Sequence, residues 1–260
     1  MKKELVDTHC HLYLEDFSGD LNAVITRARD EGVSRIYMPA IDSSYLNSML
    51  ELQKTFNGIC YSMLGLHPCY VRDNYREELD LIKNSIEKDQ FFAIGEIGLD
   101  YYWDRSFDDQ QMICFREQID LAVQYSLPIV IHSRSSIDAC IQVLQEKKSN
   151  NVRGIFHCFS GNLQNANDII ECGFMLGIGG VITYKNSGLA AVVAEVPLEH
   201  IVLETDAPYL TPVPFRGKRN ESSYLKYVVA KIAEVKNISE DEVAEVTTAN
   251  ANRVFNYNHF

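Results

Sequence analysis

Short apolar runs alternate along the chain with longer stretches in which apolar residues recur every three or four positions. The runs are rich in Val, Ile and aromatic residues, which is typical of buried parallel strands, and the stretches between them are typical of crossover helices. Eight runs fit this description: LVDTHCH (5–11), RIYMPAI (35–41), YSMLGLHP (61–68), FFAIGEIG (91–98), PIVIHS (128–133), GIFHCFS (154–160), FMLGIGG (174–180) and IVLETD (201–206). The pattern predicts eight strands joined by helices.

The spacing of these runs predicts a single barrel. Positions near their ends, such as His11, Pro39 and His67, follow one another at intervals of 22 to 36 residues. A strand, a helix and two short loops need about that many residues. No linker rich in Pro or Ser divides the chain. We therefore expect residues 1–260 to form one domain, a (β/α)8 TIM barrel of the α/β class.

Several helices can be placed from the sequence. Apolar residues at helical spacing mark the buried stripes of two of them, Met112, Phe115, Ile119 and Ala122 in one and Leu225, Val228, Val229 and Ile232 in the other. The segment from 239 to 255 predicts one extra C-terminal helix, with Ser239 as its N-cap and Glu242 three residues later.

Composition narrows the class of protein. Hydrophobic residues make up 46% of the chain and charged residues 23%, as in an ordinary soluble enzyme. The net charge of −12 argues against a protein that coats nucleic acid, although a locally positive site is compatible with it. No apolar run approaches the roughly 20 residues of a membrane span, and the N-terminal residues lack a secretory signal. We expect a cytoplasmic monomer without membrane association or an obligate protein partner.

The cysteines predict reduced thiols. There are seven of them, an odd number, and no two form a CxxC pair. Cys10 and Cys158 each stand beside a histidine, and in a strand they would point away from it and serve in packing.

Polar residues near the ends of the predicted strands carry the candidate chemistry. In a barrel enzyme the active site forms at the C-terminal ends of the strands. The residues found there are His9, His11, His67, Glu96, His132, His157 and Asp206. His200, which precedes a strand, and His259, in the terminal segment, are expected to lie outside the site.

This set predicts a metal centre. The twofold repeat of a strand places His9 and His11 on one face. Imidazoles and carboxylates together suit Zn, Mn, Fe or Ni, and Mg where carboxylates and waters dominate. Any one strand-end histidine is more often structural than functional, so the prediction depends on the whole set. Four histidines and two carboxylates exceed one open tetrahedral site, so we infer two neighbouring divalent ions (Mg, Mn or Zn) bridged by Glu96.

The motifs resemble those of a known family. In order they are HxH at 9–11, GLHP with His67, GEIGLDYYW with Glu96, IHSR with His132, HCFSG with His157 and ETDAPYLTP with Asp206. This order is similar to the TatD family of metal-dependent DNases, within the amidohydrolase-like superfamily, and the resemblance covers nearly the whole chain. It implies a TIM barrel with one ion on His9, His11, Glu96 and Asp206 and another on Glu96, His132 and His157. It also implies hydrolysis of DNA phosphodiester bonds, typically from an end.

Catalytic roles follow from the resemblance together with the chemistry of the residues. Asp206 is the candidate general base as well as a ligand, because the family pattern places it beside the attacking water. Glu96 is the bridging ligand. Glu204, two residues before Asp206, is a candidate for orienting a histidine or a water from behind. His67 is not needed as a ligand, and it is either a donor to the substrate phosphate or leaving oxygen, or a loop histidine fixed by Pro68.

Substrate contacts are predicted from charge and aromaticity. Arg134 follows His132 by two residues and either binds a phosphate or forms a salt bridge at the rim. Arg216, Lys218 and Arg219 gather in the loop after the eighth predicted strand, where a DNA backbone could bind. The aromatic residues at 101–103 either stack on a splayed base or pack as a lid.

Two other classes of function stay open at this stage. The first is a metal-dependent amidase or esterase on the same barrel, such as an aminoacyl-tRNA deacylase, since these residues do not separate attack on phosphorus from attack on an ester carbon. Amide-cleaving members of the superfamily often bridge their ions with a carbamylated lysine. The fourth predicted strand ends in Glu96 with no lysine nearby, which disfavours that type. The second is a binding module without catalysis, which has no need for six converging ligands.

Overall fold

The computed structural model describes residues 4–147 and 152–256. Its strands are all parallel and form two hydrogen-bonded groups, in the order β1-β2-β3 and β4-β5-β6-β7-β8. Their bounds are β1 Leu5–Asp7, β2 Val33–Met38, β3 Cys60–Ser62, β4 Ile94–Asp100, β5 Ile129–Arg134, β6 Gly154–Phe156, β7 Phe174–Ile178 and β8 Ile201–Leu203.

Single bridges join the two groups into a closed barrel. At the first seam the Gly95 amide donates to the Leu64 carbonyl at 2.9 Å. At the second, the Thr8 amide donates to the Leu203 carbonyl at 3.0 Å, and the Asp206 amide donates to the His9 carbonyl at 2.9 Å. The predicted barrel is confirmed, and the last strand lies beside the first. The second seam brings His9 and Asp206 together from opposite ends of the chain.

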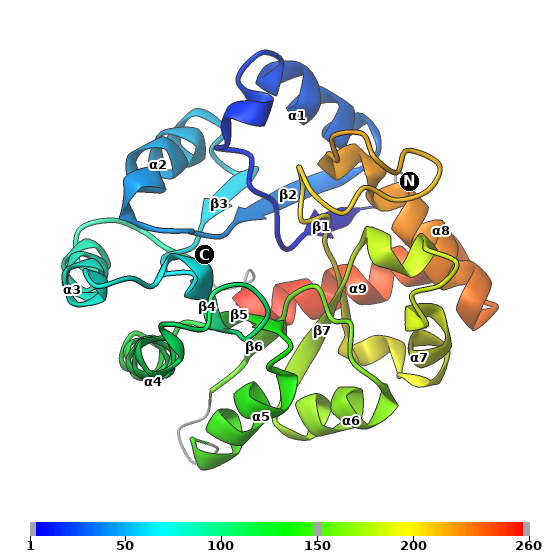
Figure 1. The fold of residues 1–260 in the computed structure, drawn as a ribbon. Helices are drawn as coiled ribbons and strands as arrows, with labels where there is room; N and C mark the ends of the chain where they lie inside the picture. The colour runs from blue at the N-terminus through cyan, green and yellow to red at the C-terminus, as the bar shows by residue number, and fades with distance from the viewer. Residues whose placement is uncertain (1–3, 148–151, 257–260) are drawn as a thin grey trace.

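Helices surround the strands in a ring (Figure 1). Their bounds are α1 Leu21–Asp30, α2 Leu46–Thr55, α3 Tyr75–Ser85, α4 Asp108–Gln124, α5 Ile137–Glu146, α6 Leu163–Glu171, α7 Leu189–Glu195 and α8 Leu225–Lys236. Short 3₁₀ helices lie in the loops, and they are η1 Glu15–Phe17, η2 Ser43–Tyr45, η3 Pro68–Tyr70, η5 Gly180–Thr183, η6 Leu198–His200 and η7 Ser222–Tyr224. None of the helices within 4–147 and 152–256 is long and apolar enough to span a membrane.

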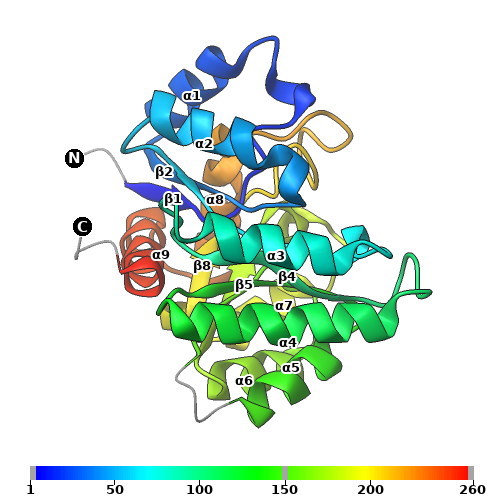
Figure 2. The ribbon, with the colours of Figure 1, turned by 90° about the vertical axis from the view of Figure 1, so that its left-hand side faces the viewer.

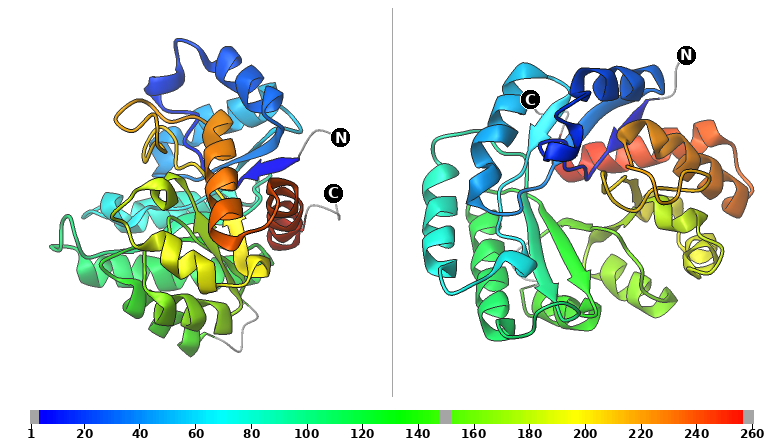
Figure 3. Two further views of the ribbon diagram at one scale, coloured as in Figure 1. Left: turned by 90° about the vertical axis from the view of Figure 1, so that its right-hand side faces the viewer. Right: turned by 45° about the horizontal axis from the view of Figure 1, so that its top comes forward.

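The predicted C-terminal helix is α9, Glu240–Phe255. Its N-cap is Ser239, whose hydroxyl accepts from the Glu242 amide at 3.1 Å. The helix crosses the end of the barrel where the strands begin (Figures 2 and 3). Phe255 stacks there on Tyr37 of β2, with ring centroids 3.7 Å apart. Because α9 covers this end, access to the barrel interior is left to the opposite end, where the strands finish.

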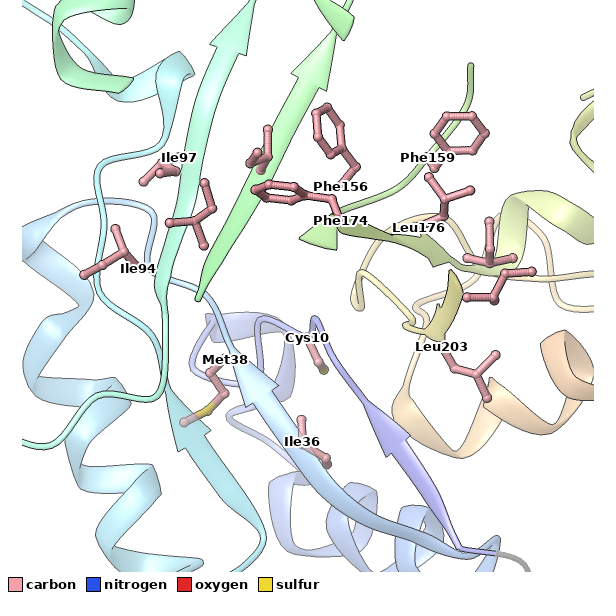
Figure 4. Close-up of a cluster of buried hydrophobic side chains, with 14 of the residues drawn as sticks. Cys10, Ile36, Met38, Ile94, Ile97, Phe156, Phe159, Phe174, Leu176 and Leu203 are labelled. Atoms are coloured by element: carbon pink, nitrogen blue, oxygen red, sulfur yellow. The ribbon is translucent and has the colours of Figure 1, made fainter. Parts of the chain in front are cut away.

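Two apolar clusters hold the barrel together. The larger fills the space between strands and helices, and Figure 4 shows part of it, including Cys10, Ile36, Phe156 and Leu203. The predicted stripes of α4 and α8 pack into it, with Phe115 and Ile232 fully buried. The smaller lies inside the barrel and extends to Phe255 of α9. Burial on both faces explains why the strands read as nearly continuous apolar runs.

Several strands, including β1 and β8, are shorter than the apolar runs suggest, whereas β4 and β5 extend past the ends of their runs to Asp100 and Arg134. β1 ends at Asp7 and β8 at Leu203, so His9, His11 and Asp206 follow the strands that position them. The chain continues there through an isolated bridge between Cys10 and Ala207. Asp206 has a φ of 55°, which turns the chain away from the sheet. The departure from the sheet at this point leaves the metal-binding candidates at the open end.

Candidate metal centre

A pocket of about 450 Å³ opens at the C-terminal end of the strands. Six of the seven strand-end candidates line it, and they are His11, His67, Glu96, His132, His157 and Asp206. Glu96 lies within β4 and His132 within β5, and the other four residues follow β1, β3, β6 and β8. His9, fully buried, completes the group from below, since its ring stacks on that of His157 at 3.5 Å. The structure thus brings together all the residues that the sequence singled out as ligands.

The Glu96 carboxylate divides this group in two. Its Oε2 atom lies 3.1 Å from the Nε2 atom of His9 and 3.9 Å from that of His11. Its Oε1 atom lies 2.9 Å from the Nδ1 atom of His132 and 3.7 Å from the Nε2 atom of His157. Each oxygen therefore faces a different pair of imidazoles, which is the arrangement that a bridging carboxylate requires.

Asp206 joins the half that contains the HxH pair. Its Oδ1 atom lies 3.4 Å from the Nε2 atom of His11 and 3.7 Å from that of His9. The same oxygen is 3.9 Å from the Nε2 atom of His157. Asp206 thus stands between the two sets of histidines, on the side facing the pocket.

The donor atoms fit divalent metal ions. Ligand atoms of His9, His11 and Asp206 lie within 4.8 Å of one another, and so do those of His9, Glu96 and His157. The two ring nitrogens of His9 are buried and make no hydrogen bond of regular geometry with any described residue, and the nearest carboxylate oxygen to Nε2 is Glu96 Oε2 at 3.1 Å. A buried polar atom without a partner costs roughly 1–3 kcal/mol. A cation coordinated by the Nε2 atom would remove that cost, so the cluster suits divalent metal binding.

The charges in the cluster favour ionised carboxylates. Burial acts to raise the pKa of Glu96, but the surrounding histidines, His67 first, bring it well below its usual range. The pKa of Asp206 is likewise lowered against burial, chiefly by His157. Burial acts to lower the pKa of His157, yet Glu204, Glu96 and Asp206 raise it to about 10. Positive charge is therefore stabilised at the place where the ligand atoms converge.

Asp100, which the sequence analysis missed, supports the ligand His132. Its Oδ2 atom lies 2.8 Å from the Nε2 atom of His132, and its side chain is only 1% exposed. His132 therefore presents Nδ1 to Glu96 and its other nitrogen to Asp100. A carboxylate behind a histidine fixes the tautomer and the orientation of the ring. The signal was in the sequence, because Asp100 follows Glu96 by four residues and so lies on the same strand face.

Glu204 occupies the equivalent place behind His157. Its Oε1 atom lies 3.1 Å from the Nδ1 atom of His157 and accepts from the Cys158 amide at 2.6 Å. The side chain is buried against Gly177, where a Cβ atom would come within 2.2 Å of the Oε2 atom. These positions agree with the orienting role predicted for Glu204. The prediction that Cys158 points away is wrong, because Cys158 has a φ of 47° and lines the pocket.

His67 is arranged as a hydrogen-bond donor. Its Nδ1 atom accepts from the Cys69 amide at 3.0 Å, so the proton of the neutral ring lies on Nε2. Burial is the main cause of its lowered pKa, which keeps the ring neutral. The Nε2 atom lies 3.2 Å from the Nδ1 atom of His132 and 3.3 Å from the Oε1 atom of Glu96. His67 is thus a member of the pocket, with an N–H group directed at its centre.

The predicted cationic contacts have different surroundings. Arg134 lines the pocket, with its guanidinium 4.3 Å from the ring centroid of Tyr102. Arg216 stacks over Tyr184 at 4.5 Å, and the Lys218 ammonium lies 5.9 Å from the ring of Phe215. Arg219 binds Asp20 through two bonds of 2.7 and 2.9 Å. Among the described residues, only Arg134 of these four cations lines the pocket, and the roles of the others stay predictions.

The two remaining histidines are the ones expected outside the site. His200 belongs to η6, directly before β8, and does not line the pocket. His259 lies outside the described residues.

Comparisons with known proteins agree with the motifs. The model of a family described as TatD related DNase matches residues 6–256. An uncharacterized metal-dependent hydrolase of Bacillus subtilis, YabD, is 42% identical over 255 residues, covering 98% of this chain and 100% of that protein. Among solved structures, the TatD homologue YJJV of Escherichia coli has 33% identity and a TM-score of 0.91, with 98% of this chain and 99% of that chain covered. A TatD family hydrolase of Entamoeba histolytica has 25% identity and a TM-score of 0.83, with 98% of each chain covered.

Proposed function

This chain belongs to the TatD family, whose relatives are named metal-dependent hydrolases, and from that premise we propose that it hydrolyses phosphodiester bonds of DNA, removing nucleotides from a strand end. The proposal includes two divalent ions per chain. One would be held by His9, His11, Glu96 and Asp206, and the other by Glu96, His132 and His157. The two-sided contact of Glu96 with the imidazoles supports this division.

Divalent ions at these positions would lower the pKa of a water molecule and offset negative charge on a phosphoryl oxygen. The protein supplies the proton transfers. Asp206, with a lowered pKa, is ionised and faces the pocket, so it can accept a proton from the attacking water. His67 directs a neutral N–H group into the same pocket and can donate to the leaving oxygen or to a phosphoryl oxygen.

The main observation in favour of an anionic substrate is the position of Arg134. Its guanidinium lines the pocket and has no carboxylate partner among the residues that the structure describes. Two divalent ions would also bring four positive charges, whereas the ligands Glu96 and Asp206 supply two negative ones. A phosphodiester carries one negative charge and offsets part of this excess, which a neutral ester does not.

The test is cleavage of linear single-stranded DNA by protein stripped with a chelator and then restored with Mg²⁺, Mn²⁺ or Zn²⁺. Asp206→Asn and Glu96→Gln are expected to lose the restored activity. An aminoacyl-tRNA ester offered in parallel separates the two reactions. Cleavage of the ester with the DNA left intact would contradict the proposal.

A further inference from the structure

The mouth of the metal pocket carries exposed aromatic side chains. Three of the large apolar side chains that are exposed in the described residues line this pocket, namely Tyr70 (44%), Trp103 (67%) and Tyr209 (52%). Tyr102, 55% exposed, lies beside Trp103 with its ring edge-to-face at 4.9 Å. Exposed apolar groups gathered at one pocket mark a site of binding. Tyr102 and Trp103 are therefore not packed as a lid, whereas Tyr101 is partly buried and packs against the core.

The loop that carries Trp103 is tied to the metal centre. The backbone amides of Tyr102 and Trp103 both donate to the Oδ1 atom of Asp100 at 2.9 Å. The other oxygen of this buried carboxylate binds His132. The backbone that carries the indole is thus held by the same side chain that contacts the candidate ligand His132. A large ring held by its backbone can bind a flat partner with little loss of conformational entropy.

Arg134 places a cation beside the indole. Its guanidinium carbon lies 4.3 Å from the ring centroid of Tyr102 and 5.6 Å from that of Trp103. Arg134 is also only two residues after His132. A flat apolar ring and a cation side by side match the two parts of a nucleotide, the base and the phosphate.

The charges on the surface beyond Trp103 disfavour the binding of a second nucleic-acid strand there. A neighbouring hollow of about 630 Å³ shares Cys69, Tyr70 and Trp103 with the metal pocket. Its other lining residues include three carboxylates, Asp42, Glu78 and Asp104, and one guanidinium, Arg72. A complementary strand lying over this hollow would meet more negative than positive charge. A base bound at Trp103 would therefore be one that has left its duplex.

We infer that Trp103 and Arg134 form a nucleotide subsite next to the metal centre. The indole stacks on an unpaired nucleobase, and the guanidinium binds the phosphate of the same nucleotide. This inference rests on the proposed function, because it takes the substrate to be nucleic acid. It adds which residues hold the nucleotide and which part of it each one recognises.

Fluorescence can test the stacking directly, because Trp103 is the single tryptophan of the chain. The probes are a single-stranded oligodeoxynucleotide and the same oligonucleotide with abasic residues at its terminal positions. They are titrated, with Mg²⁺ present, into Asp206→Asn protein that does not cleave them. The oligonucleotide with bases is expected to quench the tryptophan emission, and the abasic one to bind with little quenching. Equal quenching by both probes, or binding of both without quenching, would overturn the subsite.

Kinetics provide the second test. Trp103→Ala should lower kcat/KM about tenfold on the oligonucleotide with bases, within the range found for base stacking. The same change should have little effect on the abasic substrate. Trp103→Phe should retain most of the activity, and Leu163→Ala, an exposed apolar residue of α6, is the matched control. An equal loss on both substrates would overturn the subsite, whereas a wild-type protein that cleaves neither would overturn the proposed function.

Discussion

The Nε2 atom of His132 lies 2.8 Å from the Oδ2 atom of Asp100, on a buried carboxylate that also accepts from two loop amides. This contact leaves Nδ1 of His132 facing Glu96, so the ring can coordinate an ion through only that nitrogen. Asp100 is therefore a positioning residue for one half of the metal centre. It also links the candidate ligand to the aromatic loop at the mouth of the pocket.

We expect Asp100→Asn to lower metal affinity by about 10- to 100-fold, the range for residues that support a ligand from behind. The measurement is the metal content of each chain after dialysis against graded chelator. Asp80→Asn, an exposed position on α3, is the control. A variant that loses thermal stability but retains its metal would show that Asp100 only holds the loop.

His67→Ala should leave the metal content unchanged and lower kcat, because we propose His67 as a proton donor and not as a metal ligand. General acid catalysis contributes roughly 10²- to 10⁴-fold in rate. His67→Gln, whose amide can still donate, should recover part of the loss. If His67→Ala instead lost metal in proportion to activity, His67 would be a ligand.

Arg134→Ala and Arg219→Ala should have different effects. Removal of Arg134 should raise the KM for DNA about tenfold or more, since hydrogen bonds to charged groups contribute about 1.5–3 kcal/mol. Arg219 pairs with Asp20, so its removal should mainly lower the free energy of unfolding, by about 1 kcal/mol or less. Salt titrations of both variants would separate these effects. A larger rise in KM for Arg219→Ala would move the phosphate contact to that loop.

Gly177→Ala should displace Glu204 and disturb His157 with it. The added Cβ atom would lie 2.2 Å from the Oε2 atom of Glu204, far inside contact distance. Overpacking of this kind costs about 1–3 kcal/mol. The midpoint temperature of thermal unfolding and the metal content should both fall. Gly19→Ala is the control, because no atom lies within 4 Å of its added Cβ, and normal behaviour of both variants would show that Glu204 can move freely.

The sequence predicts the barrel and the metal cluster well because both follow from short-range regularities. Apolar runs repeat with the period of a strand and a helix, and the polar exceptions fall where the strands finish. The helix after Ser239 is likewise a local feature, since its cap and its stripe lie within one segment.

Other features depend on contacts between distant residues. Arg219 belongs to a basic cluster in the sequence, yet it pairs with Asp20, 199 positions earlier. The orientation of Cys158 is determined by a turn with positive φ after β6, which the apolar run conceals.

The most direct test of the two-ion account is a stoichiometric titration of chelated protein with Mn²⁺, followed by cleavage of single-stranded DNA at each step. We predict two ions bound per chain, activity that rises to its full value as the second ion binds, and neither property in Glu96→Gln. Full occupancy by two ions with the DNA left intact, or full activity at a single ion per chain, would contradict the account.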